Sequence, residues 1–382
     1  MKVCEVIEKA IRGEIRWLDA AAIVGVSDRQ MRRWRKRFEV DGARGLQDRR
    51  EGRQPGNRVS PEVATRVLEL YRTRYEGFNV QHFWEQLPEH EVTVSYSWTK
   101  CLLHEAGYVR RHPKRGIYRR RRDRKPMVGM MLHLDGSKHR WFASPDGAMQ
   151  DMLVLLDDAS GEILDAECVP EESTVTSLAL IKRVVERCGT FGSLYTDRAS
   201  HFVTTPKAGE GPDRNKKTQI ELILDELGIE LICAFSPQAR GRSERLWRTL
   251  QGRLPLELEK AQVTDYKGAN DYLKRRFIRQ FNQQFRVEPA EPGTAFVPVS
   301  GADLERLFTL RFQRTVGKDH TVRFQKQVLQ LPKPTGHTTL VDRHVDVRVS
   351  LEGAVFIYLG PRLLASFQPR VDLTDPLLDA AA

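Results

Sequence analysis

The pattern of apolar and polar positions divides the chain into three regions. Up to about residue 109, apolar residues recur with the 3.6-residue period of amphipathic helices, whereas between about 128 and 298 short strand-like apolar runs alternate with helical periods. Beyond 299, apolar and polar residues alternate one by one, as in strands with one buried face. We therefore expect a multidomain chain with N-terminal all-α helix-turn-helix units, a central α/β core and a small C-terminal all-β barrel or sandwich. The predicted domains are residues 1–50, 58–109, a basic linker at 110–127, 128–298 and 299–372.

The first helical unit has the spacing of a helix-turn-helix. A helix of small residues over 18–24 meets a turn at Gly25, and Ser27 fits the N-cap of a second helix. The buried stripe of that helix repeats at i, i+3 and i+7 from Met31. Basic residues cover its other faces, where a recognition helix meets DNA. They are Arg29, Arg32, Arg33, Arg35, Lys36 and Arg37. The alternative is a three-helix bundle with a solvated basic face.

A second helical unit and a basic segment follow. The last helix of this unit, about 95–106, carries Lys100 as its only fully charged basic residue, so packing explains the helix nearly as well as DNA contact does. Residues 110–125 then hold ten Lys or Arg and one acidic residue, which predicts a nucleic-acid tether or, alternatively, a solvated linker. The candidate DNA contacts in this segment are Arg110, Arg111, Arg119, Arg120, Arg121 and Arg122.

The composition of the chain indicates what kind of partner it binds and in which cellular compartment it acts. The formal net charge of +11 predicts a polyanionic partner, because basic proteins displace counterions from phosphates, although charge alone does not separate DNA from RNA or an anionic surface. No apolar run approaches a membrane span, and the N-terminus lacks the apolar core of a signal peptide. We expect a cytoplasmic, nucleoid-associated protein without membrane contacts. Its five scattered cysteines indicate reduced, mostly buried thiols rather than disulfides or zinc ligands.

The central region predicts an α/β sheet with strands first and crossovers after. Three antiparallel strands precede a helix that is capped at Ser173 and ends at Gly189, and then strand, helix, strand and helix follow. Three carboxylates fall at the edges of these elements, namely Asp135, Asp197 and Glu244. Carboxylates at strand ends converge in such sheets, and their like charges need a cation between them. Mg²⁺ fits because it prefers oxygen ligands, and two such ions promote phosphodiester displacement.

Each carboxylate also has a purely structural explanation. Asp135 fits a cap for the turn that follows it, and Asp197 fits a bond to backbone amides two or three residues further on. Glu244 has the i, i+4 spacing of a surface ion pair with Arg248. Taken one at a time, these explanations are as good as the metal site.

Helical spacing places Glu244 away from the leucine stripe of its helix. Its face is shared with Trp247 and Gln251, so burial of the leucines does not draw Glu244 inward. Asp157 and Asp158 are alternative metal ligands, because they end the strand expected beside the first one.

Together these motifs resemble a known family. HLDGS around Asp135, LYTDRASHF around Asp197 and SPQARGRSERLWRTLQGRL around Glu244 are similar to the three signatures of DDE-type insertion-sequence transposases, in the retroviral-integrase-like superfamily and close to the ISNCY type. The resemblance spans roughly residues 10–300 and implies an RNase H-like core behind a helix-turn-helix region. One departure is the spacer of 46 residues between Asp197 and Glu244, which is longer than the common one. The loop-like segment 204–219 accounts for the excess.

The resemblance implies that Asp135, Asp197 and Glu244 are catalytic and bind Mg²⁺, with two ions expected and Mn²⁺ as a substitute. The enzyme would cut the phosphodiester at a transposon end and use the freed 3′-hydroxyl to attack target DNA. It would bind double-stranded DNA as a homo-oligomer. By analogy, the C-terminal domain would contact DNA or other subunits. The arginines near Glu244 would contact phosphates, and these are Arg240, Arg242, Arg245 and Arg248.

Two other functions remain open. The first is a non-catalytic DNA-binding regulator built on a transposase scaffold, which would keep the basic N-terminal region and need no metal. The second is an RNase H-like nuclease without strand transfer, which would have less need of two helical DNA-reading units. The presence of all three carboxylates favours the transposase.

Overall fold

The computed structural model describes residues 3–47, 59–110, 123–204, 216–234, 241–333 and 339–368. Contacts divide the chain into two units, the first made of Met1–Arg72 with Leu87–Leu102 and the second of Thr73–Gln86 with Leu103–Ala382. Most of the predicted basic linker lies outside the described residues, as do most of the predicted insertion and the start of the glutamate-bearing motif.

The first unit is helical and contains the predicted helix-turn-helix. Helix α2 (Trp17–Val24) ends at Gly25, whose φ of 76° is a left-handed conformation that suits glycine. The Ser27 hydroxyl accepts the amide of Gln30 at 3.3 Å and caps α3 (Asp28–Asp41). Both local predictions are confirmed. The unit also contains α1 (Val3–Ile11), η1 (Gly42–Leu46), most of α4 (Pro61–Arg74), η2 (Leu87–His90) and most of α6 (Tyr96–Glu105).

The second unit is built on a five-stranded sheet with the order β3-β2-β1-β4-β5. The first three strands pair antiparallel as a meander, and β4 and β5 continue the sheet in parallel beyond β1. The strands are β1 (Leu132–His139), β2 (Gln150–Asp157), β3 (Ile163–Val169), β4 (Ser193–Thr196) and β5 (Glu230–Cys233). Helix α7 (Thr174–Cys188) begins at a capping box on Ser173 and is followed by Gly189, which confirms both predicted boundaries.

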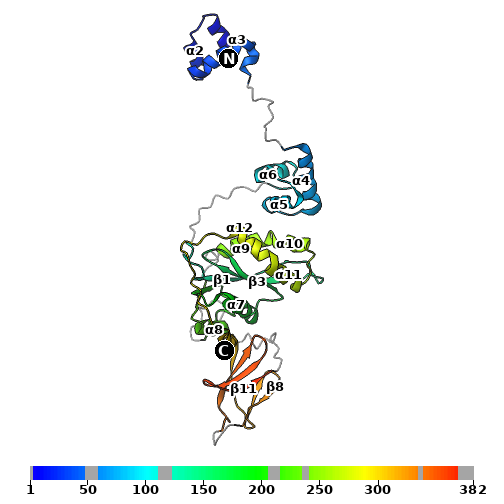
Figure 1. The fold of residues 1–382 in the computed structure, drawn as a ribbon, viewed down its shortest axis with the longest axis vertical. Helices are drawn as coiled ribbons and strands as arrows, with labels where there is room; N and C mark the ends of the chain where they lie inside the picture. The colour runs from blue at the N-terminus through cyan, green and yellow to red at the C-terminus, as the bar shows by residue number, and fades with distance from the viewer. Residues whose placement is uncertain are drawn as a thin grey trace. The chain divides into compact units, whose positions relative to one another are not determined.

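Helices cover both faces of this sheet, as Figure 1 shows. Leu132 and Leu134 of β1 belong to the cluster on the side of α7 and α8 (Gln219–Glu226). The alternate side chains of β1 point to the opposite face, where the second cluster packs beneath four further helices. These are α9 (Gly241–Gln251), α10 (Leu254–Lys260), α11 (Tyr266–Tyr272) and α12 (Ile278–Phe285), while α5 (Val80–Gln86) also belongs to this unit. The order of elements matches the predicted one from the first strand to the glutamate-bearing helix.

Two asparagines of α11 and α12 occupy the outer edge of β3. The Asn270 side chain accepts the amide of Cys168 at 2.7 Å and donates to its carbonyl at 3.0 Å. Asn282 makes the same pair of bonds with Ile163, each at 2.9 Å. Twelve residues of helix rise about 18 Å and five residues of strand about 17 Å, so both asparagines reach the same edge. The helical segment is therefore locked along β3.

A turn of π-helix, η4 (Leu273–Phe277), joins α11 to α12. Apolar residues repeat every four positions here, and Ala269, Leu273, Phe277 and Phe281 are all buried. In an α-helix, a four-residue spacing drifts by about 40° at each step. The wider π turn reduces this drift and keeps the apolar side chains on the sheet. The residues between them consequently lie on the solvent side.

The C-terminal region forms two antiparallel sheets among the described residues. One has four strands in the order β11-β10-β9-β6 and the other pairs β7 with β8, and these strands do not show a closed barrel. The buried Gln219 of α8 accepts the amide of Arg311 at 2.9 Å and donates to its carbonyl at 2.8 Å, so an amide side chain also occupies the edge of β6. The elements are α13 (Gly301–Leu307), β6 (Thr309–Thr315), β7 (Thr321–Phe324), β8 (Gln327–Gln330), β9 (His344–Ser350), β10 (Val355–Leu359) and β11 (Arg362–Phe367).

The segment that leads out of the α/β core pairs both with the segment that leads in and with the loop after α7. An isolated parallel bridge joins Val128 to Thr294, and an antiparallel one joins Thr190 to Val297. Gly189 precedes this contact with a φ of 102°, and a Cβ atom at that position would clash with the carbonyl of Val297. Glycine is therefore required there both by its conformation and by the close approach of the backbone.

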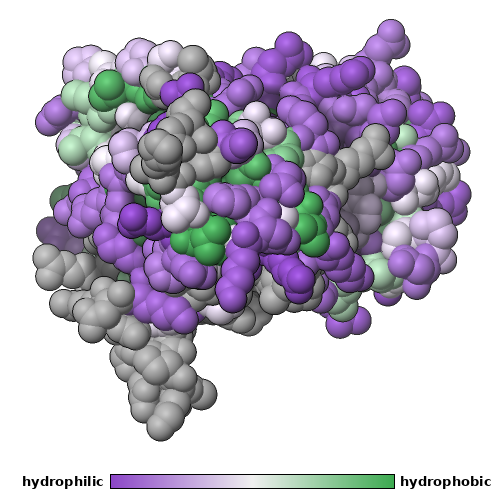
Figure 2. All heavy atoms as spheres, turned by 90° about the horizontal axis from the view of Figure 1, so that it is seen from below, coloured by the Kyte–Doolittle hydropathy of each residue, from purple (hydrophilic) through white to green (hydrophobic). Residues whose placement is uncertain are grey.

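All five cysteines are free thiols, but only Cys168 is buried and Cys101 is exposed, so the prediction that most are buried is wrong. Burial raises the pKa of Cys168 to about 12. In the described part of the chain, no helix has both the length and the apolarity needed to cross a membrane. On the face shown in Figure 2, hydrophilic residues predominate and hydrophobic residues appear only in small groups.

Candidate active site

Asp135 and Asp197 come from adjacent parallel strands at matching positions. The register pairs Leu132 with Leu194 and His133 with Tyr195, and two further residues along each strand reach the two aspartates. The two strands are about 4.8 Å apart, and the Asp135 side chain projects to the face covered by α9, where it meets Trp247. Asp135 is only 7% exposed, whereas Asp197, just beyond the end of β4, is half-buried.

Helix α9 packs on β1 through two polar contacts. The indole nitrogen of Trp247 donates to Oδ2 of Asp135 at 2.9 Å, and Gln251 Nε2 donates to the Ser137 hydroxyl at 3.1 Å. Trp247 and Gln251 are one helical turn apart, and Asp135 and Ser137 are two strand residues apart. These two separations are about the same length, so α9 runs along β1. Glu244 lies one turn before Trp247 on the same face of α9 and is exposed. The face predicted for Glu244 is thus the one turned toward Asp135.

The three carboxylates do not form a complete metal-binding site in this structure. Across the described residues, no group of three or more His, Cys, Asp or Glu side chains is arranged to hold a metal ion. One oxygen of Asp197, Oδ1, accepts the amide of Ala199 at 2.9 Å, which is the turn contact considered as its structural explanation. The backbone therefore aligns Asp135 and Asp197, and Glu244 is set on the same side of the sheet without closing on them.

Asp157 ends the strand beside β1 and Asp158 follows it, as expected, but both lie away from Asp135. The antiparallel register sets Asp157 opposite Leu132, whereas Asp135 faces Val154. Both are fully buried. The Asp157 carboxylate accepts the amides of Gly129 and Ser160 at 2.9 and 2.7 Å, so it holds the loops at the base of the sheet.

Asp158 is the anionic centre of a buried polar cluster. Its Oδ1 lies 2.7 Å from Nε2 of His133 and 2.8 Å from the guanidinium of Arg242, and its Oδ2 accepts the amide of Lys125 at 2.7 Å. Burial raises the pKa of Asp158, but the hydrogen bonds from His133 and Lys125 and the charges of His133 and Arg242 outweigh it and lower the pKa overall. The guanidinium of Arg242 is therefore engaged with Asp158 in the core, unlike the exposed Arg245 and Arg248 of the same helix.

A second pair of polar side chains, which was not predicted from the sequence, lies next to Gly136. Glu172 approaches Gly136 so closely that a Cβ atom at Gly136 would clash with its carboxylate, and Oε1 of Glu172 lies 3.2 Å from Nε2 of His201. Because Gly136 follows Asp135 in β1, this pair lies on the opposite face of the sheet. Only the presence of His201 in the second-aspartate motif signalled it in the sequence.

The candidate DNA contacts differ in their surroundings. On α3, Arg37 is half-buried, while Arg29, Arg32, Arg33, Arg35 and Lys36 are exposed. Arg32 forms an ion pair with Asp28, and Arg35 pairs with Glu39 at 2.7 Å. Arg110, Arg245 and Arg248 are also exposed. Five arginines of the basic segment and one before α9 fall outside the described residues, namely Arg111, Arg119, Arg120, Arg121, Arg122 and Arg240.

Comparison with known protein families supports the helix-turn-helix assignment. A family model described as winged helix-turn helix matches residues 17–64. Among solved structures, a simian T-cell lymphotropic virus intasome in complex with PP2A regulatory subunit B56 gamma is 13% identical, with a TM-score of 0.28, over 80% of this chain and 100% of that one. The HTLV-2 integrase catalytic core domain in complex with magnesium is 13% identical, with a TM-score of 0.26, over 42% of this chain and 98% of that one. Similarity at these scores carries no argument about function.

Two curated relatives extend over nearly the whole chain. The transposase for insertion sequence IS1202 of Streptococcus pneumoniae is 24% identical over 397 residues, covering 94% of this chain and 84% of the relative. The putative transposase y4bF of Sinorhizobium fredii is 32% identical over 352 residues, covering 91% of this chain and 76% of the relative. The resemblance predicted from the sequence motifs is thereby confirmed, and the chain belongs to the transposase family.

Proposed function

We propose that this transposase is a DDE-type polynucleotidyl transferase with an RNase H-like core, and that it cuts transposon-end DNA and joins the freed 3′-hydroxyl to target DNA. The observation that carries the proposal is the alignment of Asp135 with Asp197, together with the bond from Trp247 that turns the face of α9 toward Asp135. Asp135, Asp197 and Glu244 are the proposed catalytic residues.

The donor set fits Mg²⁺. It consists of carboxylate oxygens from two strands and one helix, and hard oxygen donors are the ligands that Mg²⁺ prefers. When bound, Mg²⁺ supplies positive charge that activates an attacking hydroxyl and stabilises the leaving oxygen. We expect two ions, with Mn²⁺ able to replace them. Glu244 would join the set from the first turn of α9.

The remaining residues of the proposed site handle DNA. We assign phosphate contacts to the exposed arginines on α3 and on α9. Such contacts position a duplex without reading its sequence. We expect the protein to act in the cytoplasm on double-stranded DNA, as a homo-oligomer because transposition joins two DNA ends. Light scattering with and without end DNA tests this, and a fully active monomer would refute it.

The decisive experiment uses the purified full chain and labelled DNA from the ends of its own element. Wild type should nick and join in Mg²⁺, while Asp197→Asn and Glu244→Gln should retain DNA binding and lose both reactions. Asp342→Asn, an exposed change of the same charge, serves as the control and should remain active. Equal nicking by Asp197→Asn and wild type would remove Asp197 from the site. Tight end binding without nicking by any protein would favour a regulator, and nicking without joining would favour a nuclease.

A further inference from the structure

A band of basic residues lies on the solvent side of the helical segment that borders β3. Between Tyr272 and Val287 the sequence holds five Lys or Arg and no acidic residue, and its other exposed positions are mainly glutamines. Four of the basic side chains fall within six residues and are exposed. We call them the basic strip, and they are Lys274, Arg275, Arg276 and Arg279.

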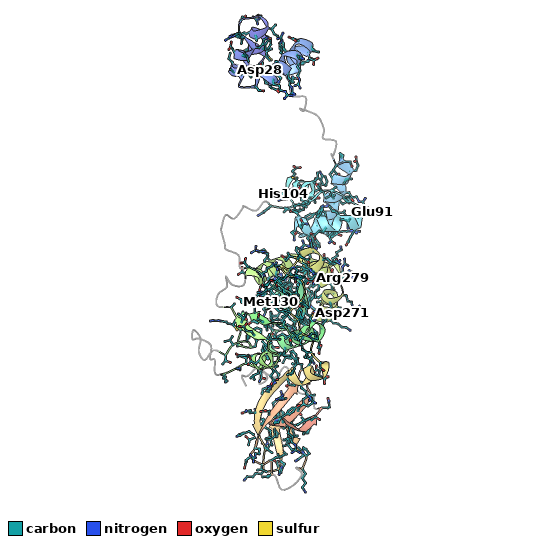
Figure 3. The ribbon with its side chains drawn as sticks, turned by 60° about the vertical axis from the view of Figure 1, so that its left-hand side comes forward. Asp28, Glu91, His104, Met130, Asp271 and Arg279 are labelled. Atoms are coloured by element: carbon teal, nitrogen blue, oxygen red, sulfur yellow. The ribbon has the colours of Figure 1, made fainter. Side chains whose placement is uncertain are left out.

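The strip is presented by a rigid support. The asparagine bonds to β3 fix both ends of the segment, and Leu273 and Phe277 are buried on either side of the first three basic residues. The π turn between these two apolar residues spreads the basic side chains over the solvent-facing side of the segment. Arg279 follows Arg275 by four residues, so the two lie about 6 Å apart along the axis. Arg279 is labelled in Figure 3 on this outer side.

Internal ion pairs do not account for the charges of Lys274, Arg275 and Arg279, the three residues on which the inference rests. Within the described part of the chain, Lys274, Arg275 and Arg279 have no carboxylate partner at ion-pair distance. Arg276 contacts Gln280 and the ring of Tyr272, which are uncharged. The one acidic residue of α11, Asp271, is exposed and lies four residues from both Lys267 and Arg275, and among the described residues it forms no ion pair with either. Charges kept this close together, without acids among them, call for an anionic partner.

We infer that the basic strip binds the phosphate backbone of duplex DNA. This inference rests on the proposed function only in taking DNA as the substrate. The strip is carried by the helices that cover the same face of the sheet as α9, and its supporting strand β3 is two strands from β1. The two strands are about 10 Å apart, and the strip lies about one helix diameter, roughly 10 Å, above β3. Both distances are well within one turn of a duplex, so one DNA molecule can contact the strip and the aspartates together.

The test replaces three residues of the strip with glutamine, in the full chain, as Lys274→Gln, Arg275→Gln and Arg279→Gln. Affinity for a duplex of arbitrary sequence is measured against salt concentration in EDTA, so catalysis plays no part. Each lost phosphate contact lowers the slope of log affinity against log salt by about 0.9, which predicts a drop of about 2 to 3. Affinity at low salt should fall by about tenfold or more.

Two controls make the result specific. A charge-matched triple variant on the α7 and α8 side, Arg187→Gln, Lys216→Gln and Lys217→Gln, should change the slope far less. Exchanging the strip residues as Lys274→Arg, Arg275→Lys and Arg279→Lys keeps the charge and should keep the wild-type slope. An unchanged thermal midpoint in the triple variant shows that folding is intact.

Two outcomes would overturn the inference. One is a strip variant with the wild-type slope and affinity. The other is a variant that loses self-association in sedimentation while its DNA binding stays the same, since the strip would then contact a second copy of the chain. The proposed function and this inference can fail independently. If wild type neither nicks nor joins DNA but its DNA binding depends on the strip, the proposed catalytic function is wrong and the inferred binding surface is still supported.

Discussion

The indole nitrogen of Trp247 donates a hydrogen bond to the carboxylate of Asp135 over 2.9 Å, and both side chains are buried. This bond joins the strand that carries the first proposed catalytic residue to the helix that carries Glu244. The ring of Trp247 also packs in the apolar cluster and lies 5.9 Å from that of Trp141. Trp247 thus has a polar role and a packing role that substitution can separate.

Trp247→Phe should retain most of the packing and remove the donor to Asp135. We expect the free energy of unfolding to fall by about 1–3 kcal/mol, because a buried carboxylate loses a hydrogen bond. Nicking should fall about tenfold, with a higher Mg²⁺ requirement, since Asp135 is held less firmly. Urea unfolding and a Mg²⁺ titration measure the two effects. Wild-type values in both would show that the bond positions nothing.

Asp158→Asn should destabilise the core by about 3 kcal/mol, because it removes the charge that balances half-buried Arg242 and weakens the hydrogen bond with buried His133. The folded pKa of Asp158 is lowered from its ordinary 3.8. Its ionised form therefore stabilises the fold above the unfolded pKa, and this contribution is lost as pH falls through the folded pKa. Unfolding midpoints between pH 2 and 6 should fall more steeply in wild type than in the variant. Parallel curves, or a variant as stable as Asp342→Asn at pH 6, would contradict this role.

Asn282→Ala should expose the edge of β3. It leaves the amide and carbonyl of Ile163 without their side-chain partner, which costs about 1–3 kcal/mol. Hydrogen exchange at the Ile163 amide should accelerate, and the thermal midpoint should fall. Gln283→Ala, at the next and exposed position of α12, is the control. If both variants melt at the same temperature, the asparagine does not hold the helix on the strand.

Gly189→Ala should be among the most damaging small substitutions in the core. The new methyl group would occupy a left-handed conformation and press on the carbonyl of Val297, at a cost above about 2 kcal/mol. Gly228→Ala has a similarly positive φ of 70° but open space around it, and should cost only about 1 kcal/mol. Thermal unfolding of the two variants separates the steric effect from the conformational one, and equal losses would show that the contact with Val297 is unimportant.

Features set by neighbours in the sequence were predictable. The cap at Ser27, the turn at Gly25 and both ends of α7 follow from what a few adjacent residues prefer, and all four are confirmed. The helical face shared by Glu244, Trp247 and Gln251 follows from the 3.6-residue period alone, although its contact with Asp135 does not.

Features set by pairing between distant segments were not predictable in the same way. Asp157 ends its strand as expected, yet the register of β2 on β1 sets it beside Leu132 instead of Asp135. Arg242 looks like its neighbouring arginines in the sequence, and only the fold brings it to Asp158. The apolar residues from Ala269 to Phe281 repeat every four positions, and this spacing can be seen in the sequence. The repeat drifts around an ordinary α-helix, and the π turn that reduces this drift is not predicted by a simple helical period.

The pairing of Val128 with Thr294 and of Thr190 with Val297 also bears on how such proteins diversify. A segment whose beginning and end adjoin behaves like a cassette, since it can be inserted between other sequences without forcing them apart. Sequences that precede residue 126 can therefore change in length without moving the strands that carry the two aspartates. The C-terminal sheets are not independent in this way, because they share one apolar cluster with the α7 side of the core.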